Sequence, residues 1–267
     1  MSYLKPSLRG KVKALVVETG QGWFCVDPDD EMITKSLVET GQYGLDEIEQ
    51  AKQFIRPDSR ILVVGAHIGT IAVPLAKLCR ELTAIEANPN TFELLKRNLL
   101  LNECTNVTAH NCAANDRDEL LSFVLNTFNS GMAKRMPKMP DAIYFHDHPK
   151  VTLVHGLRLD DLVVPHNFDL VFMDIEGSES FAFRGMPKIL ANAETLIVEF
   201  IPHHLSRVAG VTLETFLEPL TEFTHLTVPS RGLSVTGAER YSVLSEMFEA
   251  GECDNGLVFS KRGEPPR

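Results

Sequence analysis

The strongest constraint on the fold is a repeated alternation between short apolar runs and longer segments with helical spacing. Short runs with strand-like composition at 61–64, 82–85 and 106–110 are separated by helical segments at 70–79 and 89–101. Parallel strands need a crossover connection, and a helix fits that connection. The pattern therefore predicts an α/β fold with a doubly wound, mostly parallel sheet.

The rest of the chain extends this pattern at both ends. Further strands are predicted at 120–125, 168–173, 195–200 and 256–259, and helices at 178–185 and 213–220. Segment 126–150 is rich in Met, Pro and His and has no clear period, which favours a functional loop. Two apolar runs around Gly20 and Gly22 predict a hairpin, and 44–55 predicts a helix. We expect residues 1–50 to form a small accessory segment and 51–267 the main domain.

Charge and cysteine usage exclude several classes of protein. The formal net charge of -10 repels polyanions, so no nucleic-acid partner is expected. Five well-separated cysteines without a Cys-x-x-Cys pair argue against a disulfide framework or zinc ribbon and suit a reducing cytoplasm. The longest apolar stretch, 61–76, contains glycine, histidine and proline and is too short for a membrane span. A homo-oligomer is left open.

A glycine loop follows the first predicted strand, where an open α/β sheet binds its cofactor. It runs from Gly65 to Gly69, and Glu86 ends the next strand, where a carboxylate can accept both hydroxyls of a ribose. His67 occupies the middle position, at which a dinucleotide site needs glycine to let a pyrophosphate approach. The loop therefore favours S-adenosylmethionine, a nucleoside ligand without phosphates. A plain tight turn with a solvated Glu86 is the alternative.

At this point the chain resembles the FkbM family of class I methyltransferases. The matching segments are ILVVGAHIGT (61–70), AIEANP (84–89), LLKRN (94–98), NVTAHNCAA (106–114), LDDL (159–162) and MDIEGSE (173–179), followed by Gly185 and IVE (197–199). The resemblance implies a Rossmann-like methyltransferase domain in 51–267 that moves a methyl group from S-adenosylmethionine to oxygen, often a hydroxyl of a sugar or natural product. The family usually has an acid two positions before the first glycine, where this chain has Val63.

With the resemblance, the cofactor is expected to contact the glycine loop, the end of the second strand, the third loop and the acidic block. The predicted contacts are Gly65, Ala66, His67, Ile68, Gly69, Thr70, Glu86, Ala87, Asn88, Ala114, Asn115 and Asp174. Asn115 as a turn residue is nearly as good an interpretation. The family likeness also suggests that Asn129 to Gly131 lies near the acceptor, whereas His146 and His148 are expected to be solvated.

The acidic block at 174–179 supplies the candidates for catalysis. Asp174 and Glu176 follow an apolar strand at the sheet edge, where a base can take the proton of an acceptor hydroxyl. Glu199 and His203 follow the next strand and are candidates to meet the acceptor. Glu176 and Glu179 could instead cap the helix near 178. For Asp160, outside this block, we favour a turn or cap role.

Two alternatives and one cofactor question remain. Asp174, Glu199 and His203 could hold a divalent ion, but their spacing matches no ligand pattern, so no metal is predicted. A nicotinamide-dependent oxidoreductase is disfavoured by His67 and by the lack of a Tyr-x-x-x-Lys relay. A catalytically inactive relative that only binds is conceivable because of Val63.

Overall fold

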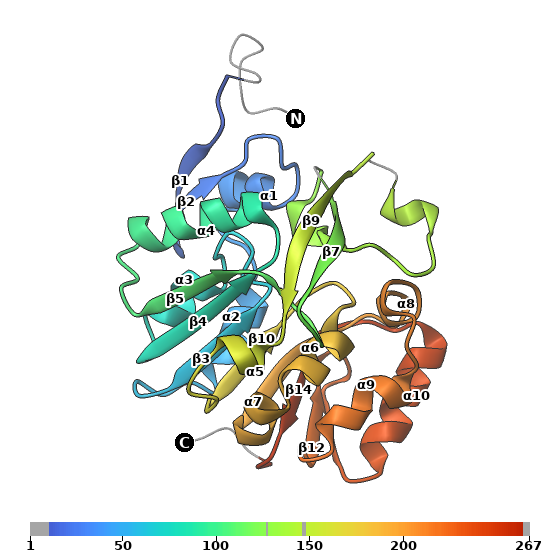
Figure 1. Cartoon of the computed structure of the whole chain (residues 1–267). Helices are drawn as coiled ribbons and strands as arrows, with labels where there is room; N and C mark the ends of the chain where they lie inside the picture. Colours follow the sequence, from blue (N-terminus) through green and yellow to red (C-terminus); the bar gives the residue numbers. More distant parts are fainter. Residues whose placement is uncertain (1–10, 127, 146–147, 264–267) are drawn as a thin grey trace.

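The computed structural model describes residues 11–126, 128–145 and 148–263 and contains an eight-stranded central sheet (Figure 1). The sheet has the order β13-β12-β14-β11-β10-β3-β4-β5. Its strands are β3 (Arg60–Val64), β4 (Glu81–Glu86), β5 (Val107–Asn111), β10 (Leu170–Met173), β11 (Thr195–Phe200), β12 (His225–Val228), β13 (Leu233–Thr236) and β14 (Asp254–Ser260). The five strands from β11 to β5 are parallel, and the remaining pairings are antiparallel. The predicted doubly wound, mostly parallel sheet is confirmed.

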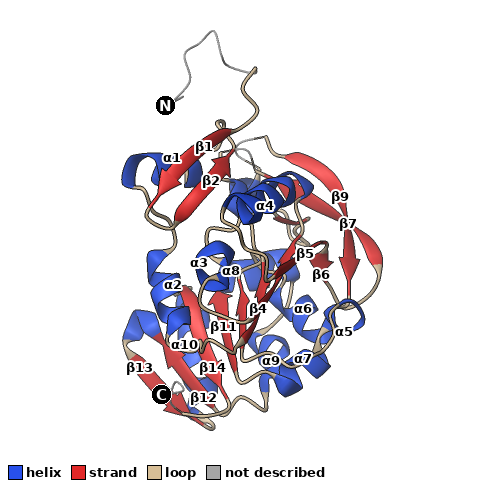
Figure 2. Cartoon of the chain, turned by 90° about the vertical axis from the view of Figure 1, so that its left-hand side faces the viewer, coloured by secondary structure: helices blue, strands red, loops and turns tan. Residues whose placement is uncertain are grey.

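Helices cover both faces of this sheet (Figure 2). One face packs against α1 (Ile33–Thr40), α2 (Leu45–Lys52), α3 (Ala72–Ala76) and α4 (Pro89–Leu101); the other packs against α5 (Leu159–Leu162), α6 (Glu179–Gly185), α7 (Pro187–Asn192), α9 (Leu213–Leu217) and α10 (Glu239–Ala250). Alternate residues of β3 enter the two cores, with Leu62 in one and Val63 in the other. Burial on both sides explains why residues 61–64 of this strand are all apolar.

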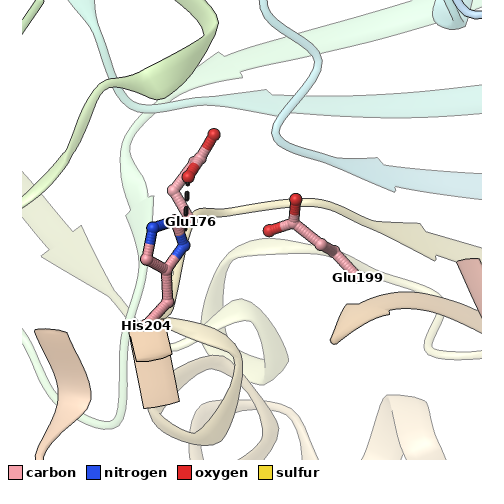
Figure 3. Close-up of side chains that lie close together, drawn as sticks. All are labelled: Glu176, Glu199 and His204. Carbon is pink, nitrogen blue, oxygen red and sulfur yellow. Dashed lines mark ion pairs between the residues drawn. The ribbon is translucent and has the colours of Figure 1, made fainter. Parts of the chain in front are cut away.

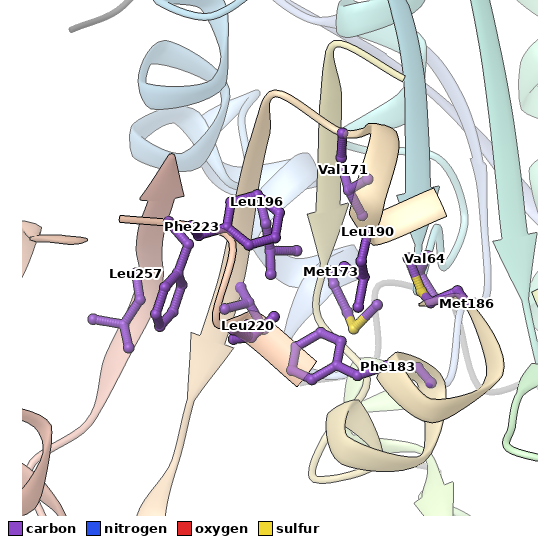
Figure 4. Close-up of a cluster of buried hydrophobic side chains, with 14 of the residues drawn as sticks. Val64, Val171, Met173, Phe183, Met186, Leu190, Leu196, Leu220, Phe223 and Leu257 are labelled. Carbon is purple, nitrogen blue, oxygen red and sulfur yellow. The ribbon is translucent and has the colours of Figure 1, made fainter. Parts of the chain in front are cut away.

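The larger core lies between β14, β11, β10 and β3 and the helices at 159–250. Figure 4 shows Val64, Met173, Leu196 and Leu257, from these four strands, facing the same layer as Phe183. Burying a side chain of this size contributes about 1.5–3 kcal/mol relative to leaving it exposed. This core therefore holds β10 and β11, whose carboxyl ends carry the acidic residues, in a rigid relative position.

A second sheet has the order β6-β9-β7-β8 and projects from one end of the central sheet (Figure 1). Its strands are β6 (Ala113–Ala114), β7 (Glu119–Leu125), β8 (Lys134–Arg135) and β9 (Lys150–Leu157). Segment 126–150, predicted to be irregular, contains β8 and two short 3₁₀ helices, Ser130–Met132 and Ala142–Tyr144. Within the described residues, no helix is long and apolar enough to cross a bilayer.

The N-terminal hairpin is joined to the main core by a buried amide. Strands β1 (Leu15–Thr19) and β2 (Gly22–Val26) pair as predicted. The Asn98 side chain of α4 accepts from Cys25 N–H at 2.6 Å and donates to the carbonyls of Cys25 at 3.1 Å and Ile68 at 2.8 Å. One amide thus connects the hairpin, α4 and the glycine loop.

Replacing Asn98 with Ala is expected to lower the free energy of unfolding by roughly 2–4 kcal/mol, because it leaves buried polar groups of Cys25 and Ile68 unpaired. Asn102 is a matched control, since it makes the same pair of bonds to Trp23 in an exposed position. Asn102→Ala should cost about 1 kcal/mol or less. Urea denaturation of both variants measures the difference, and equal losses would contradict the role of burial.

Candidate active site

A cavity lies at the carboxyl ends of β3, β4 and β10 and encloses about 990 Å³ of empty space, part of it open to solvent. The chain runs from β3 towards β5 on one side and returns through β10 on the other, so the cavity lies at the point where the strand order reverses. Its walls come from 65–67 and Thr70, 86–88, 112–114, 174–176, 130–131 and the N-terminal residues Ile33, Tyr43, Gly44 and Glu47.

The glycine loop is shaped by three residues with positive φ, Gly65, His67 and Gly69. Gly65 has φ 89°, and a Cβ at this position would lie 1.8 Å from the carbonyl oxygen of Asp174. Only glycine therefore permits this approach between the loop and the end of β10. His67 has φ 50°, which is uncommon for a residue with a side chain.

Glu86 is a buried carboxylate held by three donors. Its Oε2 accepts from His67 N–H at 2.7 Å, and its Oε1 accepts from Asn88 N–H and the Thr91 hydroxyl, each at 2.8 Å. Burial raises the pKa of Glu86, although the three donors oppose this effect. A carboxylate has about four acceptor positions, so capacity remains for a ligand in the cavity that it lines.

A hydrogen-bonded chain links the glycine loop to two other segments. His67 Nε2 lies 2.8 Å from the Ser130 hydroxyl, which donates to Asp30 Oδ2 at 2.5 Å. Asp30 Oδ1 also accepts from the N–H groups of Ile33 and Thr34 at the start of α1. Burial lowers the pKa of His67 to about 4, so the imidazole is neutral. Because the Ser130 hydroxyl gives its own proton to Asp30, Nε2 of His67 is the donor to Ser130. The His67 side chain thus ties the glycine loop to α1 and to segment 126–150.

The acidic block gathers four carboxyl groups at the base of the cavity. Asp174 faces the cavity and hydrogen-bonds to Glu199, while Glu179 accepts from Gly177 N–H at 3.1 Å. Burial, together with the charges of neighbouring acids, raises the pKa of Asp174 to about 8, and burial raises that of Glu179 to about 7. Burial and the Asp174 charge likewise raise the pKa of Glu199. The cluster is therefore an electrostatically unfavourable group that a cation would stabilise.

These raised pKa values predict that the ligand-free protein loses stability progressively as the pH rises from about 4 to about 8, and that the loss levels off above about 8. The folded state binds the Asp174 proton more tightly than the unfolded chain does, so this contribution is complete below the unfolded pKa and is lost as the pH passes about 8. Thermal denaturation of the ligand-free protein across this range measures the slope. Asp174→Asn should flatten it, and an unchanged slope would contradict the shift.

Two further residues, Lys134 and His204, also contact Glu176. Lys134 of β8 is 1% exposed, and its Nζ donates to Glu176 Oε2 at 3.1 Å. His204 Nδ1 lies 3.1 Å from the same oxygen. Burial, followed by the nearby Lys134 charge, lowers the pKa of His204 to about 3, so this imidazole is neutral. Nothing in the local sequence of Lys134 signals this role, because the irregular segment 126–150 delivers it from a distance.

His203 lies outside the cavity wall. Its ring Nδ1 is 2.7 Å from the Tyr144 hydroxyl, its Nε2 is 3.5 Å from Asp141, and the side chain is 45% exposed. Of the two neighbouring histidines, His204 is the one that faces the acids. The sequence analysis chose His203 as the candidate to meet the acceptor, whereas the structure places His204 against Glu176.

The other predicted site residues divide into two groups. The cavity wall includes Gly65, Ala66, His67, Thr70, Glu86, Ala87, Asn88, Ala114, Asp174 and Glu176. Outside the wall are Ile68, Gly69, Asn115, Glu199 and His203. Ile68 is buried in the core, Gly69 packs close to Leu95, and the fully buried Asn115 donates to Arg117 and Glu119, so none of these three is placed to meet a ligand.

The remaining predictions concern caps and loop residues. Asp160 accepts from the N–H groups of Lys188 and Ile189 and so caps α7, in line with the cap role favoured for it. Ser130 and Gly131 line the cavity. His148 is exposed, and His146 lies outside the described residues.

Several known proteins similar to this chain are methyltransferases. The protein named "Probable ribosomal RNA small subunit methyltransferase A" of Methanosphaera stadtmanae is 36% identical over 53 residues, which is 20% of each protein. The FkbM methyltransferase structure from Methylobacillus flagellatus KT has a TM-score of 0.44 and 16% identity, covering 77% of this chain and 44% of that one. TYW2 of M. jannaschii, solved with AdoMet, has a TM-score of 0.45 and 14% identity, covering 95% and 87%.

The chain thus spans a fifth of the curated relative and less than half of the Methylobacillus structure. These structural similarities are weak, with TM-scores below 0.5. A family model described as "Methyltransferase FkbM domain" matches residues 64–228, which is more than half of the chain. The chain therefore belongs to the FkbM family of methyltransferases.

Proposed function

We propose that the protein is an S-adenosylmethionine-dependent methyltransferase that methylates a hydroxyl oxygen of a small molecule or sugar. The observation that carries this proposal is a single cavity with two chemically different ends. One end contains Glu86, a fixed carboxylate suited to the hydroxyls of a ribose, and the other contains Asp174 and Glu176.

The residues present fit such a cofactor. Cys112, Ala113 and Phe123 supply apolar wall area for a nucleoside base, and the acidic end suits the positive charges of a sulfonium and an ammonium group. When bound, the cofactor supplies an electrophilic methyl group. Among the described lining residues there is no Lys or Arg, so a diphosphate would meet acids without a compensating cation. This disfavours the nicotinamide alternative.

The chain's own task is to hold the acceptor hydroxyl and to receive its proton. Glu176 lines the cavity, and its Oε2 is held by Lys134, which keeps the carboxylate in one orientation. Asp174 lies beside it and hydrogen-bonds to Glu199. We propose Glu176 or Asp174 as the group that accepts the proton, with Glu199 as a positioning residue behind Asp174.

The acceptor is proposed to be a neutral small molecule. The net charge of -10 and the acidic end of the cavity both repel phosphate groups. The N-terminal residues are proposed as an accessory segment, up to about residue 50, that completes the cofactor site through Ile33, Tyr43 and Glu47. The remainder, 51–267, would carry the catalytic residues.

Calorimetry with S-adenosylhomocysteine and with NAD tests the cofactor. We expect 1:1 binding of the first and none of the second; the reverse result would overturn the proposal. Incubation with a methyl-labelled donor and a panel of glycans, polyketides and transfer RNA tests the acceptor. Label on a small-molecule hydroxyl supports the proposal, and label on RNA alone would contradict it.

A further inference from the structure

We propose that Glu176, Glu199 and His204 form a binding site for a divalent transition metal at the acidic end of the cavity. Each residue offers one ligand atom, and these atoms all lie within 4.8 Å of one another. Figure 3 shows the His204 ring against the Glu176 carboxylate, with the Glu199 carboxylate directed towards the same space. A first-row metal binds such ligands at about 2.0–2.2 Å. Because the three ligand atoms already lie within 4.8 Å of one another, small rotations of the three side chains would bring them to this distance from one ion.

The backbone is shaped to bring these ligands together from three separate elements. Glu176 follows β10 and has φ 54°, in the left-handed region that a residue with a side chain rarely adopts. Glu199 lies near the end of β11, and His204 ends α8 (Pro202–His204). Gly177 has φ 95°, and a Cβ on it would lie 2.9 Å from the Cβ of His204. The glycine therefore permits the close approach of His204 to Glu176.

A second, independent observation points to a ligand at this place. His204 is 8% exposed, and its buried Nδ1 makes no hydrogen bond in the described structure, although it lies 3.1 Å from Glu176 Oε2. Leaving a buried polar atom unpaired is unfavourable, because the atom has lost its hydrogen bonds to water. A metal ion would use the lone pair of this nitrogen and remove that cost.

The charge around the site also favours a cation. Asp174 and Glu179 lie next to the two proposed carboxylate ligands, and Lys134 is the cation in contact with the cluster. Four carboxyl groups lie near one ammonium group, and a bound cation would favour the ionised forms of these carboxyl groups. Lys134 binds Oε2 of Glu176, which leaves the second oxygen of that carboxylate for a metal.

The ligand set selects the class of metal. One imidazole nitrogen and two carboxylates favour Mn²⁺, Fe²⁺, Co²⁺ or Zn²⁺ over Mg²⁺ and Ca²⁺, which prefer oxygen ligands alone. Three protein ligands leave coordination positions open. If the proposed function holds, an acceptor hydroxyl can occupy one of them, and its pKa would fall. Its O–H bond would then break with the proton passing to the ionised carboxylate of Asp174, and an O–CH₃ bond would form as the S–CH₃ bond breaks.

Titration of chelator-treated protein with Co²⁺ and with Mn²⁺ tests the site. We expect one ion per chain with a Kd below about 100 µM. Affinity should fall at least about tenfold in Glu199→Gln and in His204→Ala. His203→Ala is the matched control, since His203 is the neighbouring histidine outside the cluster, and it should retain binding. Pulsed electron paramagnetic resonance of the Mn²⁺ form should show coupling to an imidazole nitrogen that is lost in His204→Ala.

Failure of the wild type to bind either ion overturns the proposal, as does equal loss in His203→Ala and His204→Ala. Absence of nitrogen coupling in bound Mn²⁺ overturns the ligand assignment. If His204→Ala does not fold, two measurements still test the site: the metal affinity of Glu199→Gln and the nitrogen coupling in the Mn²⁺ form of the wild type. S-adenosylhomocysteine binding is measured in parallel. If the wild type binds metal but not S-adenosylhomocysteine, the proposed function is contradicted. If it binds S-adenosylhomocysteine but neither metal ion, the metal site alone is contradicted.

Discussion

Glu176→Gln is expected to lower kcat by about 10²–10⁴-fold, the usual contribution of a positioned general base. Glu176 lines the cavity beside Asp174, and the substitution removes both its basicity and much of its capacity as a metal ligand. The amide is nearly the same size, and affinity for S-adenosylhomocysteine should change by less than about threefold, since this cofactor product lacks the sulfonium charge. Methyl transfer to the identified acceptor and calorimetry give the two values.

Glu179→Gln is the matched control for this prediction. It removes one carboxyl from the same cluster, but at a residue that is 2% exposed and bonded to the backbone of Gly177. We expect reduced stability and a much smaller change in kcat. Full activity of Glu176→Gln would refute its assignment, and equal losses of kcat in both variants would show that only the summed charge matters.

Glu86→Gln is expected to weaken S-adenosylhomocysteine binding by about 10–100-fold, or about 1.4–2.7 kcal/mol. The two carboxylate oxygens accept from the N–H groups of His67 and Asn88, so an amide must direct its NH₂ against one of these donors. The variant therefore disturbs the glycine loop as well as the proposed ribose contact. Calorimetry measures the loss.

Glu93→Gln, an exposed glutamate on α4, is the control for Glu86 and should bind as the wild type does. Melting temperatures of the ligand-free variants separate loss of stability from loss of the ribose contact. Unchanged affinity in Glu86→Gln would show that the ligand does not use this carboxylate, and the proposed cofactor orientation would be wrong.

The parallel core could be predicted closely from the sequence. Helix α4 has the predicted bounds Pro89–Leu101, because Asn88 caps it, accepting from Asn90 N–H, and Pro89 starts it. Strand β11 has the predicted bounds Thr195–Phe200, because its apolar residues 196–198 and Phe200 suit a strand buried on both faces. These signals are local, so they can be identified without knowledge of the fold.

Elements at the margins could not be predicted in this way. Strand β9 (Lys150–Leu157) alternates exposed Val151 and Leu153 with residues directed inwards, and it exists as a strand through its pairing with β7. Helix α10 (Glu239–Ala250) buries Leu244 and Met247, a narrow apolar stripe that the sequence analysis did not identify. For both elements, tertiary partners outweigh the local pattern.

By itself, the sequence determined the parallel sheet, the glycine loop and the placement of Glu86 and Asp174 in one cavity. The ends of neighbouring parallel strands converge at one edge, so strand assignment alone brings such residues together. Only the tertiary structure decided that Lys134 and His204, rather than His203, contact Glu176. Adjacent residues of a helix point about 100° apart, and the packing of that helix determines which one faces the site.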